Sequence, residues 1–187
     1  SYNNWRGEMG NWKWDNSGPD LGLYSGWTGT RFYRMHQAVI RRHKAIGNYA
    51  RGVWFDYDNA DILYEDALLE GNMDGLKFEV DQGPIWIKDC RIINNRLSGI
   101  LVQVARDVTL QGCELTGNCY LQSDEPKVHI RITNATEHYQ GSWEGGSQTL
   151  YLEEWTMVDN LFGGGVEPYP LIAAPNFANF VNTLNSY

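Results

Sequence analysis

No stretch of the sequence approaches the roughly 20 consecutive apolar residues that are needed to span a bilayer. We therefore predict no membrane insertion. Cysteine is scarce: three residues in 187 cannot form the disulfide framework of a small secreted domain. Lysine and arginine total 15 against 23 acidic residues, for a net charge of −8, and no basic cluster offers a path for phosphates. This composition argues against nucleic-acid binding.

The sequence has no zinc-site spacing among its four histidines, no phosphate-binding loop and no nucleophile elbow. The first residues lack the basic leader and the apolar segment of a signal peptide. Because the chain opens in the middle of a motif and stops without an evident cap, we expect it to be a fragment of a longer protein.

A repeat of about two dozen residues dominates what is present. Gly52, Gly75 and Gly99 each begin a run of alternating apolar and polar residues, and these glycines lie 23 and 24 residues apart. A second alternating run follows each first run, and each unit ends on an asparagine. These asparagines are Asn72, Asn95 and Asn118, with Asn48 ending an earlier and less regular unit. A fixed period of this length is typical of solenoids.

Alternation with a period of two indicates strands, because successive strand side chains point to opposite faces. Short strands without intervening helices stack most simply as coils of a parallel β-helix, in which equivalent strands lie about 4.8 Å apart. We therefore predict an all-β solenoid with coils of about 23 residues. In this solenoid Val53, Leu76 and Ile100 lie above one another and point inward.

The whole chain, 1–187, is predicted to form one β-helix domain. Residues 1–30 form an irregular, aromatic-rich flank, and residues 31–118 form the regular coils. Residues 119–187 contain interrupted coils with a loop insertion and a C-terminal segment, and Val128–Ile132 is the candidate for the next first-type strand.

Two sets of equivalent residues are predicted to stack. The recurring asparagines suit a ladder at a bend, since asparagine tolerates left-handed backbone and its amide can bond to stacked neighbours. Cys90 and Cys113 also occupy equivalent positions, 23 residues apart. Whether these two thiols are bridged is left open by the sequence.

The same residues carry a resemblance to a known family. The runs from Gly52 to Asn72, from Gln82 to Ile85 and from Val108 to Asn118 resemble right-handed parallel β-helix proteins of the pectate-lyase-like superfamily. The segments Asn4–Gly7 and Arg34–Arg41 resemble bacterial exported β-helix repeat proteins. The resemblance implies a right-handed coil and an extracellular or cell-surface location. It does not imply one activity, because this fold hosts lyases, hydrolases, epimerases, adhesins and scaffolds.

The outward residues of the first strands form the candidate catalytic group. Asp56 and Glu79 are predicted to stack about 5 Å apart, with Lys77 beside them. Carboxylates at that distance suit a retaining glycosidase. The alternative is a set of ordinary solvent-facing positions, in which Lys77 offsets the acids.

Calcium is the second chemical use of this surface. Asp58 and Asp81 extend the acidic row, and several oxygens on one face can hold Ca²⁺. Such a cation would acidify a uronate, and Lys77, Arg31 or Arg34 would then serve as the base, as in β-helix lyases. Apart from this possible Ca²⁺, we expect no cofactor.

Aromatic and basic residues supply candidate substrate contacts. Trp54 lies in the same outward rows, and Trp12 and Trp14 belong to the aromatic flank, where indoles offer flat platforms for sugars. Arg34 and His36 are placed by the coil model at the edge of the acidic patch.

Two functions remain open. The first is an exported β-helix protein that binds a polysaccharide and, if it is an enzyme, also cleaves it. The second is a non-catalytic structural or adhesive module of a larger surface or matrix assembly, whose open solenoid ends are covered by other protein chains.

Overall fold

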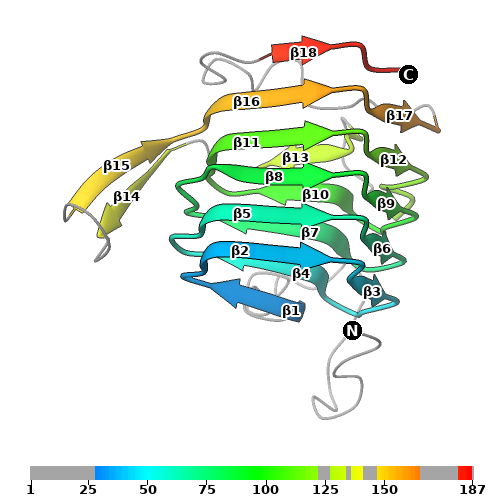
Figure 1. Cartoon of the computed structure of the whole chain (residues 1–187). Coiled ribbons are helices and arrows are strands. Elements are labelled where there is room, and N and C mark those ends of the chain that lie inside the picture. The colour runs from blue at the N-terminus through cyan, green and yellow to red at the C-terminus, as the bar shows by residue number, and fades with distance from the viewer. Residues whose placement is uncertain (1–27, 122–126, 134–135, 141–146, 165–180, 187) are drawn as a thin grey trace, which may run out of the picture.

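A computed structural model of the chain describes residues 28–121, 127–133, 136–140, 147–164 and 181–186 (Figure 1). All regular elements in these ranges are strands, and they wind into a stack of coils with three parallel sheets. The described part of the chain contains no helix with the length and apolar character that a membrane span requires.

Each sheet is named here by its first strand. The β1 sheet contains β1 (Thr28–Tyr33), β4 (Arg51–Asp56), β7 (Asp74–Glu79), β10 (Ser98–Val102) and β13 (Ile130–Ile132). The β2 sheet contains β2 (His36–Arg41), β5 (Ala60–Glu65), β8 (Ile85–Lys88), β11 (Arg106–Gln111), β16 (Glu153–Val158) and β18 (Val181–Thr183). The β3 sheet contains β3 (Lys44–Ile46), β6 (Leu68–Glu70), β9 (Arg91–Ile93), β12 (Glu114–Thr116) and β17 (Leu161–Gly163).

The predicted vertical alignment is confirmed by the strand register. Val53 pairs with Leu76, and Leu76 pairs with Ile100, always in parallel. Val128–Ile132 also behaves as predicted, because β13 continues the β1 sheet by pairing with β10. Between β13 and β16 the chain departs into an antiparallel hairpin of β14 (Thr136–Gln140) and β15 (Ser147–Tyr151), which projects from the stack in Figure 1.

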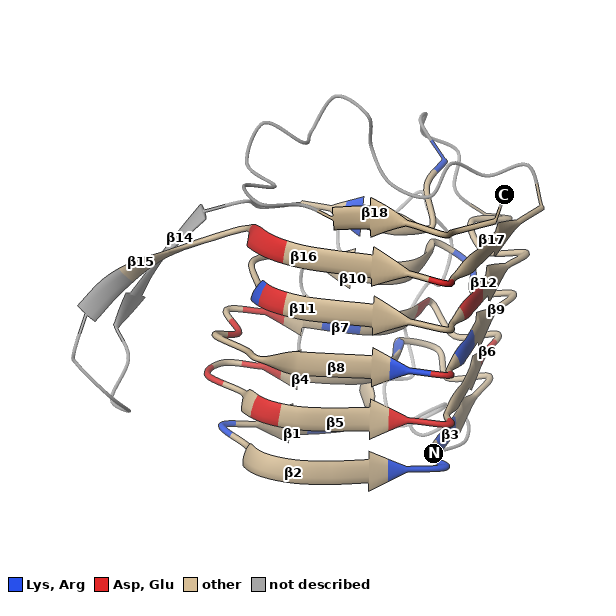
Figure 2. Ribbon diagram, turned by 45° about the horizontal axis from the view of Figure 1, so that its top comes forward, with Lys and Arg blue, Asp and Glu red and all other residues tan. Residues whose placement is uncertain are grey.

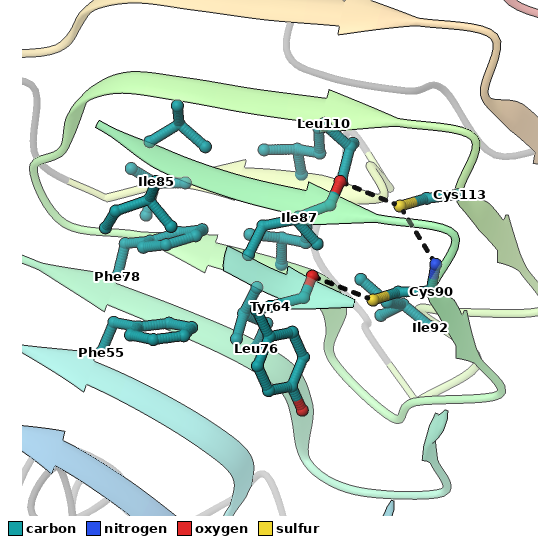
Figure 3. Packing of buried hydrophobic residues seen from close by; sticks show 14 of the residues in the cluster. Phe55, Tyr64, Leu76, Phe78, Ile85, Ile87, Cys90, Ile92, Leu110 and Cys113 are labelled. Carbon is teal, nitrogen blue, oxygen red and sulfur yellow. Dashed lines mark hydrogen bonds between the residues drawn. The ribbon is translucent and has the colours of Figure 1, made fainter. Parts of the chain in front are cut away.

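The core consists of ladders of like side chains inside the coils (Figure 3). Phe55 and Phe78 stack with ring centroids 5.5 Å apart, and Tyr64 meets Phe55 edge-on at 5.7 Å. The Phe55–Phe78 stack follows from the repeat, because parallel in-register strands place equivalent residues of successive coils side by side, whereas the Tyr64–Phe55 contact joins two sheets across the core. Aromatic pairs in these geometries add to the stabilisation from burial alone.

The repeated glycines have a packing reason. A Cβ atom on Gly75 would lie 2.7 Å from the carbonyl oxygen of Gly99 and 2.8 Å from Nδ2 of Asn95. Gly52 meets Asn72 in the same way, at 2.7 Å. Each glycine therefore makes room for the amide of the asparagine that ends its own unit, which explains why the two residue types recur together.

The asparagine ladder is confirmed. The backbone N–H groups of Asn48, Asn72 and Asn95 each donate to Oδ1 of the next asparagine at 3.0 Å. Cys90 and Cys113 stack at the bend between the β2 and β3 sheets, where the Cys90 N–H donates to Cys113 Sγ at 3.4 Å (Figure 3). Both cysteines are free thiols, which answers the question that the sequence left open.

One inward assignment is wrong. If the alternation of apolar and polar residues continued beyond Phe78 and Val102, it would place Val80 and Val104 in the main core, but these two residues form a separate small buried cluster with Leu150, against which Tyr57 packs. Tyr57 and Val80 have left-handed backbone, with φ of 59° in both. The strand geometry therefore ends one residue earlier than the apolar pattern suggests, and the chain turns toward the β2 sheet.

Candidate functional site

Two outward columns of the β1 sheet bring the candidate residues together. Strand register places Arg31 beside Trp54, and Trp54 beside Lys77, on three successive coils. It also places Asp56 beside Tyr33 and Glu79. The predicted pairing of Asp56 with Glu79, and of Trp54 with Lys77, is therefore confirmed.

Trp54 lies between two cations. The guanidinium carbon of Arg31 is 4.5 Å from the centroid of the indole, and Lys77 Nζ is 4.2 Å from it. Cation–π attraction is strongest for tryptophan and increases when the pair is desolvated. The indole thus fixes the positions of one cation from the coil before it and one from the coil after it.

Each of these cations also forms an ion pair with a carboxylate. Arg31 pairs with Asp56, and Lys77 pairs with Glu79. Burial nevertheless raises the pKa of Asp56, although Arg31 opposes the shift. Burial likewise lowers the pKa of Lys77, although Glu79 opposes that shift. Both shifts favour the neutral forms, which suits proton transfer.

The expected exposure of this surface is not observed. Trp54, Asp56 and Lys77 are only 4%, 4% and 2% exposed. Their positions on the outer side of the strands are as predicted, but they are not ordinary solvent-facing residues. Of the five residues in the array, the side chains of Arg31 and Glu79 remain accessible, with 44% and 23% exposure.

A third ion pair lies at the start of the same strands. Arg51 Nε is 3.7 Å from Asp74 Oδ2, and Ser98 Oγ donates to Asp74 Oδ1 at 2.6 Å. Burial lowers the pKa of Arg51, while Asp74 and Glu79 oppose the shift. The charged array therefore extends along β4 and β7, which the sequence did not indicate.

Asp81 does not lie in an exposed acidic row. Its side chain is fully buried and accepts hydrogen bonds from Asn59 Nδ2 at 2.7 Å, from Asn59 N at 3.2 Å and from Glu79 N at 3.1 Å. Burial raises the pKa of Asp81 to about 8. Tyr57 and Asp58 both have left-handed backbone, so Asn59, and not Asp58, comes to lie against Asp81.

Three of the four carboxylate oxygens of Asp58 and Asp81, the residues expected to bind calcium, accept hydrogen bonds within the protein. Asp58 Oδ1 accepts a hydrogen bond from Gln82 Nε2 at 2.7 Å, and both oxygens of Asp81 are engaged as described. Within the ranges that the structure describes, no group of three or more His, Cys, Asp or Glu side chains is arranged to hold a metal ion.

His36 and Arg34 lie at the corner where the β1 sheet turns into the β2 sheet. His36 Nε2 is 4.0 Å from Asp58 Oδ2, so the structure brings together two residues that the sequence assigned to different roles. The guanidinium carbon of Arg34 is 5.4 Å from the Tyr33 ring centroid and 5.0 Å from that of Tyr57. Trp12 and Trp14 lie outside the described residues.

The two tyrosines at this corner were missed by reasoning from sequence. Tyr33 and Tyr57 stack with centroids 5.9 Å apart and planes at 11°. The distribution of charge along the chain could have indicated the basic residues that surround them. Residues 28–50 contain five lysines and arginines and no acidic residue, whereas residues 51–73 contain six acidic residues and one arginine.

Comparison with solved structures finds the same fold in two epimerases. A double mutant of the periplasmic alginate epimerase AlgG is 15% identical, with a TM-score of 0.61 over 85% of this chain and 36% of its own. The A-module of the Azotobacter vinelandii mannuronan C-5 epimerase AlgE4 has the same identity, TM-score and coverage of this chain, with 44% of its own length covered. The chain thus spans less than half of either structure.

Sequence comparison is informative at the level of the family. No curated protein sequence matches the chain. The family model described as the right-handed beta helix region matches residues 16–143, which is more than half of the chain. This match agrees with the coils, the parallel register and the stacked ladders described above. The chain therefore belongs to the right-handed β-helix family.

Proposed function

We propose that this chain is an exported β-helix protein that binds a polysaccharide on the outward face of the β1 sheet. The observation that carries the proposal is the array in which Trp54 lies between Arg31 and Lys77, each paired with a carboxylate. Sites for sugars combine apolar aromatic surface with a few well-placed polar groups. The accessible side chains of Arg31 and Glu79 are the part of this array that a ligand in solution would contact first.

The similar structures support both parts of the proposal. One is named as an alginate epimerase and the other as a mannuronan epimerase, so proteins of this fold act on polysaccharides. The first is also described as periplasmic, which supports export. Fold alone does not carry a function, so the proposal depends on the array and not on the likeness.

Cleavage is a second candidate, favoured by the placement of Lys77 and Asp56 in one array, where burial shifts the pKa of each toward its neutral form. Lys77, once it has lost its proton and its ion pair with Glu79, would remove the proton from C5 of a uronate. The electron pair would form the C4–C5 double bond, and a protonated Asp56 would give its proton to the departing glycosidic oxygen. Lys77→Met would then slow elimination by about 10²–10⁴-fold, measured as the ultraviolet absorbance of unsaturated uronates.

The binding proposal is tested by calorimetry with a panel of acidic and neutral polysaccharides. We expect Asp56→Asn to weaken binding by about tenfold, because it releases Arg31 from its ion pair and alters the accessible end of the array. Glu114→Gln is the matched control, since it breaks the Arg91–Glu114 ion pair on the β3 sheet. If no polysaccharide binds the unmodified protein, the proposal is wrong.

The burial of Trp54 and Lys77 favours a different role, in which the array stabilises a structural module. In that case Asp56→Asn and Lys77→Met would lower the melting temperature without changing any affinity or rate. Binding and melting are therefore measured on the same samples, so that the two roles give different patterns.

A further inference from the structure

We propose that the exposed corner made by Arg31, Tyr33, Arg34 and Tyr57 is a subsite for an anionic sugar residue. This inference rests on the polysaccharide-binding function proposed above, and it adds the position of the subsite and the charge of its ligand. The corner is continuous with the Trp54 array, because the Arg31 guanidinium carbon lies 5.2 Å from the Tyr33 ring centroid and 4.5 Å from that of Trp54.

Charge along the solenoid is the first argument. Although the chain has a net charge of −8, the coil from 28 to 50 carries five cations and no acidic residue. Figure 2 shows the contrast between the basic C-terminal end of β2 and the acidic positions of β5 on the next coil. Local charge of one sign raises the concentration of oppositely charged ligands at that place.

Not all cations of this coil are neutralised by the acidic coil beside it. Arg31 pairs with Asp56, and Arg41 pairs with Glu65. Arg34, in contrast, forms no ion pair with any described residue, and its contacts are with the two tyrosine rings. Its guanidinium therefore retains donors for a ligand, and a guanidinium can bind a carboxylate or sulfate through two parallel hydrogen bonds.

The tyrosine pair is the second argument. Tyr33 and Tyr57 are nearly parallel, so that together they form one stacked unit across two coils. Tyr33 nevertheless keeps 52% of its surface exposed. Tyrosine combines an apolar ring, which can contact the C–H groups of a sugar, with a hydroxyl that can bond to sugar oxygens. Few exposed large residues of the described chain have cations packed beside them in this way.

The backbone holds the corner in place. Arg34 and Tyr57 occupy equivalent positions on successive coils, and both have left-handed backbone, with φ of 51° and 59°. The Arg34 N–H donates to the Tyr57 carbonyl oxygen at 3.1 Å, which ties the two turns together. Left-handed backbone is unfavourable for a residue other than glycine, so these two turns are held by the surrounding coils and by this hydrogen bond. These turns are thus fixed before any ligand arrives, which reduces the entropy lost on binding.

The test compares two arginines on the same coil. Arg34→Gln and Arg42→Gln each remove one charge from an exposed, left-handed position, but only Arg34 lies at the tyrosine corner. Tyr33→Ala is paired with Tyr120→Ala, because Tyr120 is exposed to a similar extent, at 54%. The probes are an oligouronate, a sulfated oligosaccharide and a neutral glucan of similar length, with affinities measured by calorimetry at low and high salt.

We expect Arg34→Gln and Tyr33→Ala each to weaken oligouronate binding by about tenfold or more, and the two controls to stay within about twofold. The affinity of the unmodified protein should fall with added salt. The sulfated probe shows whether the subsite selects the anion or the uronate ring. Equal losses for Arg34→Gln and Arg42→Gln, or preferred binding of the neutral glucan, would overturn the subsite while leaving polysaccharide binding intact. Failure of every probe to bind the unmodified protein would instead refute the proposed function.

Discussion

Two ladders run along the solenoid at opposite ends of the β3 sheet, and they use the same backbone with different side chains. In the ladder between the β3 and β1 sheets, Asn48, Asn72, Asn95 and Asn118 follow one another. In the ladder between the β2 and β3 sheets, the successive residues are Cys90, Cys113, Asn160 and Asn185. Both ladders follow a residue with left-handed backbone, for example Gly71 before Asn72 and Asp89 before Cys90.

The bend therefore does not require asparagine, but the hydrogen bonds of the ladder do differ with the side chain. Cys113 N–H donates to Asn160 Oδ1 at 2.9 Å, whereas Cys90 N–H reaches only the Cys113 sulfur, at 3.4 Å. Sulfur is a weak acceptor. The comparison indicates that the asparagine ladder contributes more stability per coil than the cysteine pair.

Removal of one asparagine should have the largest effect. Asn72 accepts from the backbone and side chain of Asn48, at 3.0 and 2.7 Å, and donates to the Ala45 carbonyl oxygen at 2.8 Å. Asn72→Ala would leave these buried groups without partners, at about 1–3 kcal/mol each. We expect the free energy of unfolding to fall by about 3–5 kcal/mol, measured by urea denaturation.

Cys113→Ala is the control for this prediction. It removes the sulfur that accepts from Cys90 N and that lies 3.4 Å from the Ile87 carbonyl oxygen. The expected loss is about 1–2 kcal/mol, because the replaced bonds are weak and the lost volume is small. An equal loss in both variants would show that the two ladders are energetically alike.

The sequence allowed the ladders and the register to be predicted, because every coil repeats the same apolar spacing and a one-residue shift would expose the core. The position of Asp81 was predicted wrongly for the opposite reason. The prediction assumes that inward and outward residues keep alternating past Asp56 and Glu79. Tyr57 and Val80 end this alternation because their backbone is left-handed, and no local sequence motif indicates that conformation. Non-glycine residues adopt this conformation rarely, so sequence patterns give it little weight.

The candidate site could be predicted only in part. The columns that contain Asp56, Glu79, Trp54 and Lys77 follow from the repeat and were anticipated. Their burial was not, because the exposure of an outward strand position depends on packing that the repeat does not encode. The pKa shifts follow from that burial, so they could not be inferred from the sequence either.

The upper end of the asparagine ladder should make stability depend on pH. His129, which is the equivalent of Gly99 on the next coil of the β1 sheet, contacts the last asparagine: its Nδ1 accepts from Asn118 Nδ2 at 3.1 Å and its Nε2–H donates to the Gly163 carbonyl oxygen at 3.0 Å. Burial lowers the pKa of His129 to about 4, from an unfolded value of 6.5. Protonation would remove the acceptor and place a charge in the core.

The sign follows from proton binding in the two states. Between about pH 6.5 and pH 4 the unfolded chain binds a proton at His129 that the folded chain does not. Stability is therefore fully present above about pH 6.5 and is lost as the pH falls toward 4, by about 2–3 kcal/mol. Denaturation of the unmodified protein and of His129→Asn is measured at about pH 7.5, above this window, and at about pH 4.5, near its lower end. A pH dependence that persists in His129→Asn would assign the effect to other groups.

The smallest expected effect comes from Cys113→Asn, which replaces a cysteine of one ladder by the residue type of the other. Asn160 donates through Nδ2 to the Leu110 carbonyl oxygen at 2.9 Å, and Cys113 Sγ faces the equivalent carbonyl of Ile87 at 3.4 Å. An asparagine at 113 could therefore accept from Cys90 N and donate to Ile87 O, as Asn160 does one coil further along. We expect Cys113→Asn to raise the free energy of unfolding by about 1 kcal/mol, the net value of a typical hydrogen bond. Loss of stability would mean that the space at this bend, and not the strength of the acceptor, selects cysteine. Because Cys90 and Cys113 are both buried beside the core, that outcome would also explain why two coils keep thiols while the next two carry amides.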